Sequence, residues 1–211
     1  MNSNLAPLLE RNRAFAETDT RTHVPQQPFL PHQGLFIVTC MDSRTDPADF
    51  LGLRFGEAIV ARTVGGRVTP AVIQGVAFLG YVVETKAPDG PYFEVAIIHH
   101  TDCGSTLLAD EEFRQGFTER TGFDDDALAG LPVLDPAATE NSSNASGFPV
   151  LDPAVTVRTD VERMLSDPRI SSRIAVSGHV YDVDTGLVRT VVEPASPRGH
   201  ALRRPDRQVV D

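Results

Sequence analysis

Two short apolar runs constrain the fold of this chain more than any other feature. Residues 35–40, LFIVTC, and residues 92–100, YFEVAIIHH, are almost continuously apolar and rich in β-branched side chains. Strands covered on both faces have this composition, whereas strands with one wet face alternate between apolar and polar residues. Since parallel strands are usually covered on both faces, the two runs predict an α/β protein with a mostly parallel sheet.

Helix signals and further strand signals complete this pattern. An Asp-Pro pair at 46–47 and a Thr-Pro pair at 69–70 each combine an N-cap residue with proline in the first turn, and another helix is expected over residues 106–120. Strands are expected at three places: residues 57–62, 173–183 and 187–193, the last two joined by the turn DTG. We therefore expect an open, mostly parallel β-sheet flanked by helices, with an antiparallel edge strand.

The length of 211 residues and the 41% hydrophobic content are typical of one domain with insertions. We expect residues 1–33 to form an N-terminal helix and arm, and residues 196–211 to form a C-terminal tail. Residues 122–153 predict a surface insertion, partly disordered, because GLPVLDPA recurs there as GFPVLDPA after 17 residues. Two copies are too few for a solenoid and indicate a local duplication.

The charge and the cysteine count exclude some classes of function. A formal net charge of -10 argues against a nucleic-acid partner, which needs clustered Lys and Arg. No apolar run is long enough to span a membrane, and the first residues lack a secretory-signal pattern, so we expect a cytoplasmic protein. In that reducing compartment the two cysteines are expected to be thiols or metal ligands.

Chemistry-bearing residues follow both apolar runs. In CMDSR, the side chains of Cys40, Asp42 and Arg44 would project to one side of an extended chain. In HHTDCG, His100 and Cys103 are spaced so that both could bind one ion. Both segments lie at carboxyl ends of predicted parallel strands, where ligands gather in such sheets. Two thiolates and one imidazole suit Zn²⁺ and leave a fourth tetrahedral position open, which suggests catalysis.

The two motifs together resemble the β-class carbonic anhydrases, whose pattern is Cys-x-Asp-x-Arg followed by His-x-x-Cys. Three further segments, ARTVGGRVTP, DEEFRQGF and VSGHVYDVDTGLV, are also similar to that family, so the resemblance covers roughly residues 35–192. It implies an enzyme that hydrates CO2 to bicarbonate by means of a metal-bound hydroxide.

The resemblance also implies a role for each residue of the two motifs. One Zn²⁺ per subunit would be held by Cys40, His100 and Cys103. Asp42 would accept the proton of the hydroxide in a hydrogen bond, and Arg44 would keep that carboxylate charged and off the metal. If Asp42 instead left Arg44 and bound the metal, the site would be closed.

The expected substrate pocket departs from the family pattern at one place. Gly65 and Gly66 match a glycine pair beside the active site, but Thr63 and Val64 stand where the family commonly has Asn and Ala. The added bulk bears on substrate identity more than on zinc binding. The alternative function is therefore hydrolysis of carbonyl sulfide, or of a related CS2-type substrate, by the same site. A non-catalytic zinc-binding scaffold is the third hypothesis.

Other polar residues near the motifs have simpler interpretations. We expect His99 to pack or to support the ligands, Asp102 to be a turn residue, and His179 and Tyr181 to support the sheet near its edge.

The family resemblance also implies a homodimer or a higher homo-oligomer, with the N-terminal helix across a partner. The apolar face of Leu5, Leu8 and Leu9 agrees with that expectation.

Overall fold

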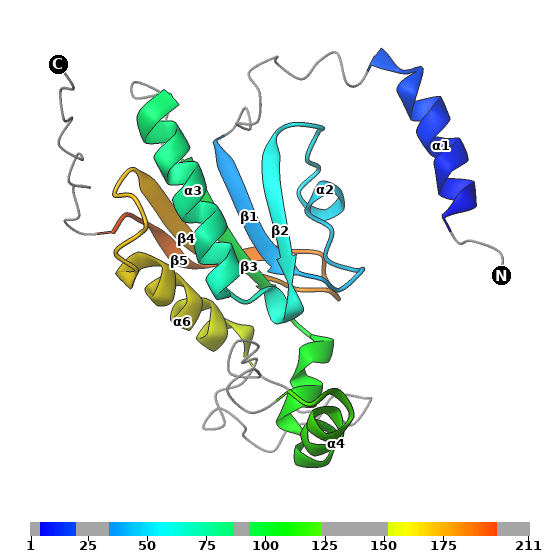
Figure 1. The fold of residues 1–211 in the computed structure, drawn as a ribbon, viewed down its shortest axis with the longest axis vertical. Helices are drawn as coiled ribbons and strands as arrows, with labels where there is room; N and C mark the ends of the chain where they lie inside the picture. The colour runs from blue at the N-terminus through cyan, green and yellow to red at the C-terminus, as the bar shows by residue number, and fades with distance from the viewer. Residues whose placement is uncertain (1–4, 20–33, 87–92, 124–151, 198–211) are drawn as a thin grey trace, which may run out of the picture.

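The computed structural model describes residues 5–19, 34–86, 93–123 and 152–197 (Figure 1). The strands are β1 (Leu35–Cys40), β2 (Ala58–Thr63), β3 (Phe93–His100), β4 (Ile174–Tyr181) and β5 (Val188–Ala195). The α-helices are α1 (Ala6–Ala16), α2 (Pro47–Phe50), α3 (Pro70–Lys86), α4 (Glu111–Thr121) and α6 (Pro153–Ser166). Two 3-10 segments are η2 (Val64–Gly66) and η3 (Gly104–Ala109).

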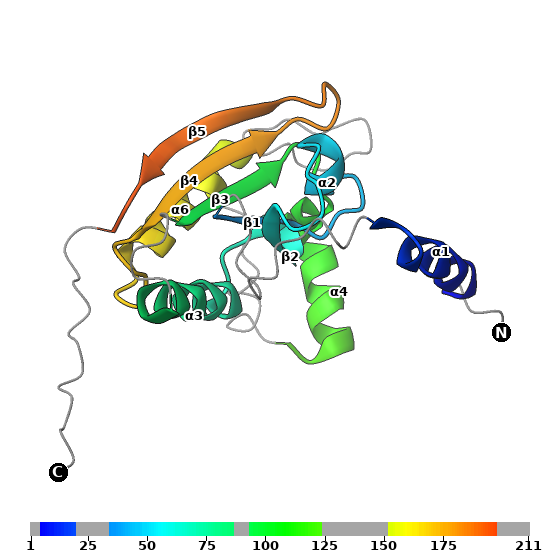
Figure 2. The same cartoon turned by 90° about the horizontal axis from the view of Figure 1, so that it is seen from above.

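The five strands form one sheet in the order β2-β1-β3-β4-β5 (Figure 2). β1, β2, β3 and β4 pair in parallel, and β5 pairs antiparallel with β4. The predicted fold class is confirmed. Since β1 pairs in parallel with both β2 and β3, the carboxyl ends of these three strands lie at the same edge of the sheet, where ligands bind in open α/β folds.

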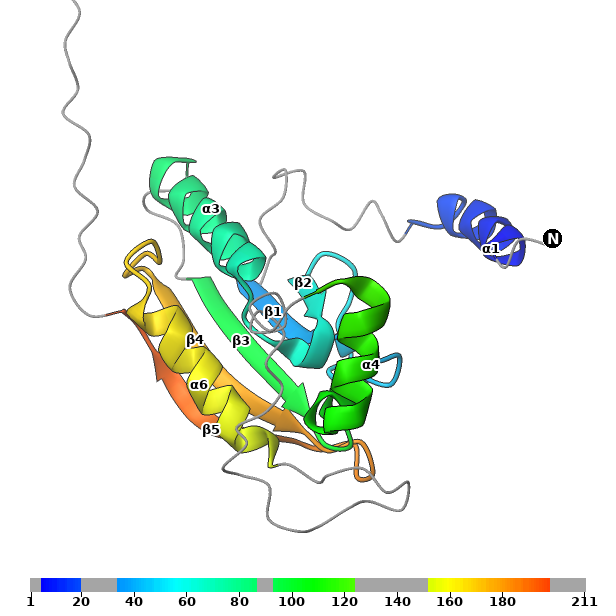
Figure 3. The ribbon, with the colours of Figure 1, turned by 60° about the horizontal axis from the view of Figure 1, so that its bottom comes forward.

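Helices cover the two faces of the sheet unequally. α3 and α6 lie along one face, where they bury the larger hydrophobic cluster with β1, β3 and β4 (Figure 3). Ile37, Ala96 and Ile98 form a smaller cluster on the other face, and Phe50 of α2 packs against it. The apolar strands predicted from the sequence are therefore buried on both faces.

Helix capping explains where most helices begin. The side chain of Asp46 accepts a hydrogen bond from Ala48 N at 3.0 Å, which caps α2 as expected. The predicted helix over residues 106–120 is divided, because Asp110 adopts an extended conformation and its carboxylate caps Phe113 N at 2.7 Å. The result is a 3-10 turn, η3, followed by a separate helix, α4.

Helix α6 is not predicted by the sequence analysis, although its signals are present. Asp152 caps Ala154 N at 2.9 Å, and proline stands in the first turn. The helix packs closely on β4, because a Cβ at Gly178 would lie 2.5 Å from Val157 Cγ1. Residues 152–154 belong to the second copy of the repeat, so this copy ends as the start of a helix. The first copy, the N-terminal arm and most of the predicted insertion and tail lie outside the described residues.

The N-terminal helix α1 forms as predicted but buries none of its residues. Figures 1 to 3 show it apart from the sheet. One contact of α1 is that of Phe15 with Phe55, whose ring centroids are 6.0 Å apart. In the described part of the chain, no helix is both long and apolar enough to cross a membrane.

Candidate metal centre

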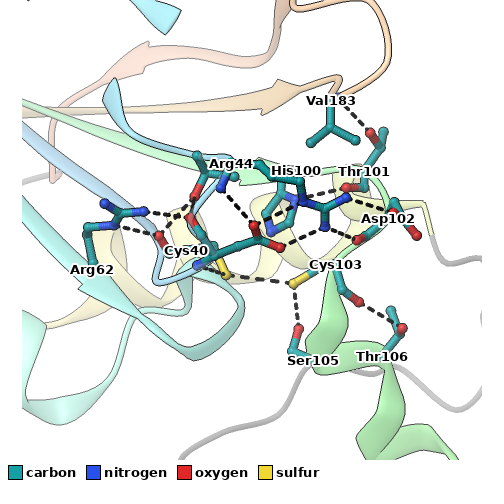
Figure 4. A network of polar contacts seen from close by, with 12 residues as sticks. Cys40, Arg44, Arg62, His100, Thr101, Asp102, Cys103, Ser105, Thr106 and Val183 are labelled. Atoms are coloured by element: carbon teal, nitrogen blue, oxygen red, sulfur yellow. Dashed lines mark hydrogen bonds and ion pairs between the residues drawn. The ribbon is translucent and has the colours of Figure 1, made fainter. Parts of the chain in front are cut away.

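Three potential metal ligands converge at the carboxyl ends of β1 and β3. Cys40 is the last residue of β1, His100 is the last residue of β3, and Cys103 follows three residues later. Their ligand atoms all lie within 4.8 Å of one another, and the two Sγ atoms are 3.8 Å apart (Figure 4). Among the described residues this is the one group of three or more such side chains that could hold an ion. The structure thus brings together residues that are 63 positions apart in the chain.

The chemistry of this donor set fits Zn²⁺. Two thiolates at tetrahedral positions, each about 2.3 Å from the ion, would be separated by about 3.8 Å. His100 is buried, and its Nδ1 lies 2.8 Å from the carbonyl oxygen of Thr101, which fixes the ring. Its Nε2 is also buried and has no hydrogen-bond partner in the described structure. A buried nitrogen without a partner is costly, and a metal ion would satisfy it.

The two thiols interact directly and change each other's pKa. The hydrogen bond from Cys103 lowers the pKa of Cys40 to about 4, although burial opposes this. The same interaction, together with burial, raises the pKa of Cys103. Ser105 Oγ also lies 2.8 Å from Cys103 Sγ. The interaction of the two thiols therefore favours the loss of one proton from the pair, which leaves a thiolate able to bind a metal ion.

Asp42 and Arg44 form a bidentate pair beside the ligands. Arg44 Nε donates to Asp42 Oδ1 at 3.0 Å, and Arg44 Nη2 donates to Asp42 Oδ2 at 2.7 Å. These hydrogen bonds lower the pKa of Asp42 to about 2 and raise the pKa of Arg44, to which Asp102 also contributes. The backbone N of Asp42 lies 3.4 Å from Cys40 Sγ, so the pair adjoins the thiolate. Asp42 is thereby a charged hydrogen-bond acceptor across the pH range in which most proteins work.

Arg62 and Thr45 hold the loop after β1, a role that the sequence analysis missed. Arg62 Nε donates to the carbonyl oxygen of Cys40 at 3.0 Å, and its Nη2 donates to that of Asp42 at 2.6 Å (Figure 4). Thr45 is buried, and its hydroxyl lies within hydrogen-bond distance of the same two carbonyl oxygens. The available signal was the position of Arg62 near the end of a strand next to β1.

The glycine pair after β2 lies behind and beside the ligands. Gly65 and Gly66 are buried and have φ of 67° and 72°, a conformation that favours glycine. A Cβ at Gly66 would lie 3.2 Å from Cys40 N and 3.1 Å from His99 Cδ2, so this glycine permits close approach to both strands. Val64 and Gly65 line the pocket over the candidate metal centre, whereas Gly66 is not among its lining residues.

A pocket of about 340 Å³ opens over the thiols and Asp42. Its far wall consists of apolar side chains from η3 and α4: Leu107, Leu108, Phe113 and Phe117. The polar groups that reach it are few and lie at the ligand end. Such a site suits a small, weakly polar ligand that reacts at the bottom of the pocket.

A buried charge network supports β3 from below the site. Asp160 of α6 accepts hydrogen bonds from Arg67 Nε at 2.7 Å and from Val68 N at 3.0 Å. His99 Nε2 lies 3.3 Å from the same carboxylate, and His99 Nδ1 lies 2.7 Å from Thr156 Oγ1. The expectation that His99 packs or supports the ligands agrees with this position. Asp160 was missed because α6 was not predicted.

His179 and Tyr181 lie on β4. His179 Nε2 is 2.9 Å from Ser177 Oγ, and the ring of Tyr181 stacks on that of Phe50 with centroids 4.4 Å apart. His179 thus contacts a neighbouring side chain of its own strand, and Tyr181 contacts helix α2.

Comparison with known proteins agrees with this geometry. The family model described as carbonic anhydrase matches residues 35–188. β-Carbonic anhydrase 1 of Mycobacterium tuberculosis is 30% identical over 164 residues, which are 78% of this chain and 85% of that protein. The chain belongs to the β-carbonic anhydrase family.

Two further proteins are similar to the chain, one in sequence and one in structure. A carbon disulfide hydrolase of Acidithiobacillus thiooxidans is 30% identical over 162 residues, which are 74% of this chain and 75% of that protein. The crystal structure of a carbonic anhydrase from Streptococcus mutans matches with a TM-score of 0.62 and 31% identity. That match covers 90% of this chain and 99% of the other. The chain is therefore similar both to proteins named carbonic anhydrase and to proteins named carbon disulfide hydrolase.

Proposed function

We propose that the protein is a zinc-dependent enzyme that hydrates CO2 to bicarbonate. The observation that carries this proposal is the joint position of two thiols, one unpartnered imidazole nitrogen and a clamped carboxylate at the bottom of one pocket. Cys40, His100 and Cys103 would hold one Zn²⁺ per subunit. Bound zinc would act as a Lewis acid and lower the pKa of water from about 15.7 to roughly 7.

The residues around the ion would have separate tasks. Asp42 would accept a hydrogen bond from the nucleophile and so direct its lone pair toward the carbon of CO2. Arg44 holds both oxygens of that carboxylate, which keeps it charged and fixes its direction. The apolar wall of the pocket would receive the nonpolar substrate. Val64 and Gly65 would limit the pocket on the opposite side.

Hydrolysis of carbonyl sulfide or carbon disulfide is the second candidate function. The observation that favours it is the apolar wall formed by Leu107, Leu108, Phe113 and Phe117, together with the carbon disulfide hydrolases among the relatives. Sulfur is larger and less polar than oxygen, and the same attack on carbon applies to all three linear molecules. The shape of the pocket would then determine the preferred substrate.

One zinc-loaded preparation tests both functions. We expect about one zinc per chain by metal analysis, and a kcat/KM for CO2 that exceeds those for COS and CS2. A preference for either sulfur compound would favour the second candidate. A zinc-loaded protein that turns over none of the three would contradict both and support a non-catalytic scaffold.

Two variants separate metal binding from catalysis. Cys40→Ser should lose zinc, because it removes one of the two thiolates that would hold the ion. Asp42→Asn should keep zinc but lower kcat by about 100-fold or more, because the amide cannot replace a charged acceptor. Asp167→Asn is the matched control, since Asp167 pairs with Arg169 in the same way on a remote surface. Retained zinc in Cys40→Ser would contradict the proposed ligand set.

We also propose that the chain forms a homodimer or larger homo-oligomer through α1, and that it acts in the cytoplasm. The exposed leucines of α1 support the first proposal. The two thiols support the second, because a reducing compartment would keep them able to bind a metal.

A further inference from the structure

Arg44 is held by two carboxylates from two different loops. Besides its bonds to Asp42, its Nη1 donates to Asp102 Oδ2 at 2.9 Å and its Nη2 donates to the carbonyl oxygen of Asp102 at 2.9 Å (Figure 4). Asp42 follows β1, whereas Asp102 lies between His100 and Cys103 after β3. The guanidinium therefore connects the two loops that carry the candidate ligands.

A second Asp-x-Arg pair, Asp167 and Arg169, shows that the contact between Asp42 and Arg44 needs only the local chain. Arg169 donates from Nε and Nη2 to the two oxygens of Asp167 at 2.8 Å and 2.6 Å. Its backbone N also donates to Asp167 Oδ1, as that of Arg44 does to Asp42 Oδ1. Among the described residues Arg169 has no second carboxylate partner. The two-residue spacing thus produces the bidentate Asp-Arg pair in both places. The additional contact with Asp102 distinguishes the Asp42–Arg44 pair from the Asp167–Arg169 pair.

The backbone of Asp102 adopts a conformation that is unusual for its residue type. Its φ is 52°, and it is the one non-glycine residue with positive φ in the described part of the chain. This conformation costs roughly 1–2 kcal/mol for residues with a Cβ, although Asp and Asn tolerate it best. A turn alone would be served better by glycine. We infer that the Asp102 carboxylate makes an interaction that offsets this strain, and the observed interaction is its ion pair with Arg44.

We propose that Asp102 is a positioning residue: it fixes the Arg44 guanidinium, and through it the Asp42 carboxylate, relative to the loop of His100 and Cys103. This inference rests on the proposed function, in which Asp42 directs the nucleophile. The side chains of Arg44 and Asp102 are each 46% exposed. The bidentate pair holds Arg44 and Asp42 to each other, but it does not fix either of them relative to the loop of His100 and Cys103. A second carboxylate, that of Asp102, restricts the rotation of the Arg44 guanidinium that the pair with Asp42 alone would allow.

The direct test compares two substitutions that both fit the turn. Asp102→Gly relieves the strain and removes the carboxylate, and Asp102→Asn keeps an acceptor without charge. We expect Asp102→Gly to lower kcat about tenfold with KM changed less than about twofold, because only orientation is lost. Asp102→Asn should recover part of kcat, while the control Asp167→Asn should match the wild type. Wild-type kcat in Asp102→Gly would overturn the proposal.

A second readout does not depend on turnover. In the full chain, with and without zinc, ¹⁵N NMR can follow solvent exchange of the Arg44 Nε proton, identified by its loss in Arg44→Lys. We expect exchange to be several-fold faster in Asp102→Gly and close to wild type in Asp167→Asn. Unchanged exchange would overturn the positioning role. If the wild type turned over no substrate, the proposed function would fail, and this measurement would still decide whether Asp102 restrains Arg44.

Discussion

At the scale of single residues, the buried carboxylate of Asp160 is the most consequential charge outside the metal centre. It is fully buried and joins Arg67 of the η2–α3 junction to α6. Removing one partner from such a pair leaves the other charge buried and uncompensated.

We therefore expect Asp160→Asn to lower the free energy of unfolding by about 3–5 kcal/mol. Asp167→Asn is the control, because Arg169 is exposed and such pairs contribute about 0–1 kcal/mol. Urea denaturation of both variants measures the difference. Similar losses of unfolding free energy in the two variants would show that the buried ion pair contributes no more to stability than the exposed one.

The same carboxylate predicts an acid dependence of stability. Burial alone would raise the pKa of Asp160, but the close approach of His99 and the hydrogen bonds from Arg67 outweigh it and hold the pKa at about 2. A folded pKa below the ordinary value means that the unfolded chain binds the proton first. The contribution is therefore complete above pH ~4 and is lost as the pH falls toward 2, a change of about 2 kcal/mol.

The measurement is the difference in unfolding free energy between the wild type and Asp160→Asn at several pH values. We expect this difference to shrink between pH ~4 and ~2, since only the wild type can take up this proton. A constant difference over that interval would argue against the depressed pKa.

At the scale of elements, Gly66 in the turn η2 lies close to the backbone of both β1 and β3. Gly66 and Gly186 share a φ of 72°, but a Cβ at Gly66 would press on Cys40 N and Ile98 O, while one at Gly186 would meet nothing within 4 Å. The two positions thus separate crowding from backbone strain.

Gly66→Ala should cost more stability than Gly186→Ala, which carries only the strain of roughly 1–2 kcal/mol. It should also weaken zinc binding, because the ends of the two ligand-bearing strands would be pushed apart. Chelator competition and urea denaturation measure these effects. Equal losses of stability and equal zinc affinity in Gly66→Ala and Gly186→Ala would show that the ends of β1 and β3 can move to accommodate the added Cβ.

The sequence was informative wherever signals were local. The apolar strands predicted the sheet, and Asp46 with its following proline predicted the start of α2. Helix α6 was missed because the Asp152 cap lies inside a repeat that suggested a loop, and the break at Asp110 was missed because one cap interrupts a helical pattern.

Contacts between distant segments were harder to foresee. The candidate ligand set could be predicted from strand ends and motif spacing. The hydrogen bond between Arg44 and Asp102 joins residues 58 positions apart and depends on side-chain directions. Asp102 could be placed in a turn, but its φ and its partner depend on where β3 ends next to β1. Register and side-chain rotamers set such contacts, and periodicity does not encode them.

At the scale of the whole molecule, α1 buries none of its own residues against the described part of the chain. It has 11 residues, none of them buried, and Leu5, Leu8 and Leu9 are 48–56% exposed. Isolated helices shorter than about 12–15 residues are marginal in water. A second copy of the chain would supply the missing contact.

We expect light scattering to give at least twice the monomer mass of 22.9 kDa. The double substitution Leu8→Asp and Leu9→Asp should shift the protein toward monomer, because it places charge on the apolar face. Leu187→Asp is the control, since Leu187 is 69% exposed on the β4–β5 turn. A wild-type protein found only at 22.9 kDa would refute the proposed assembly.

The placement of the candidate ligands on neighbouring strands also bears on the lifetime of the folded state. Cys40 and Cys103 are 63 positions apart, and the intervening chain contains β2 and α3. A bound ion would close this segment into a ring that cannot open until a ligand leaves. The site exists only after β1 has paired with β3, so the ion would change the rate of folding little and chiefly slow unfolding. Loss of metal would then shorten the time for which each molecule stays folded.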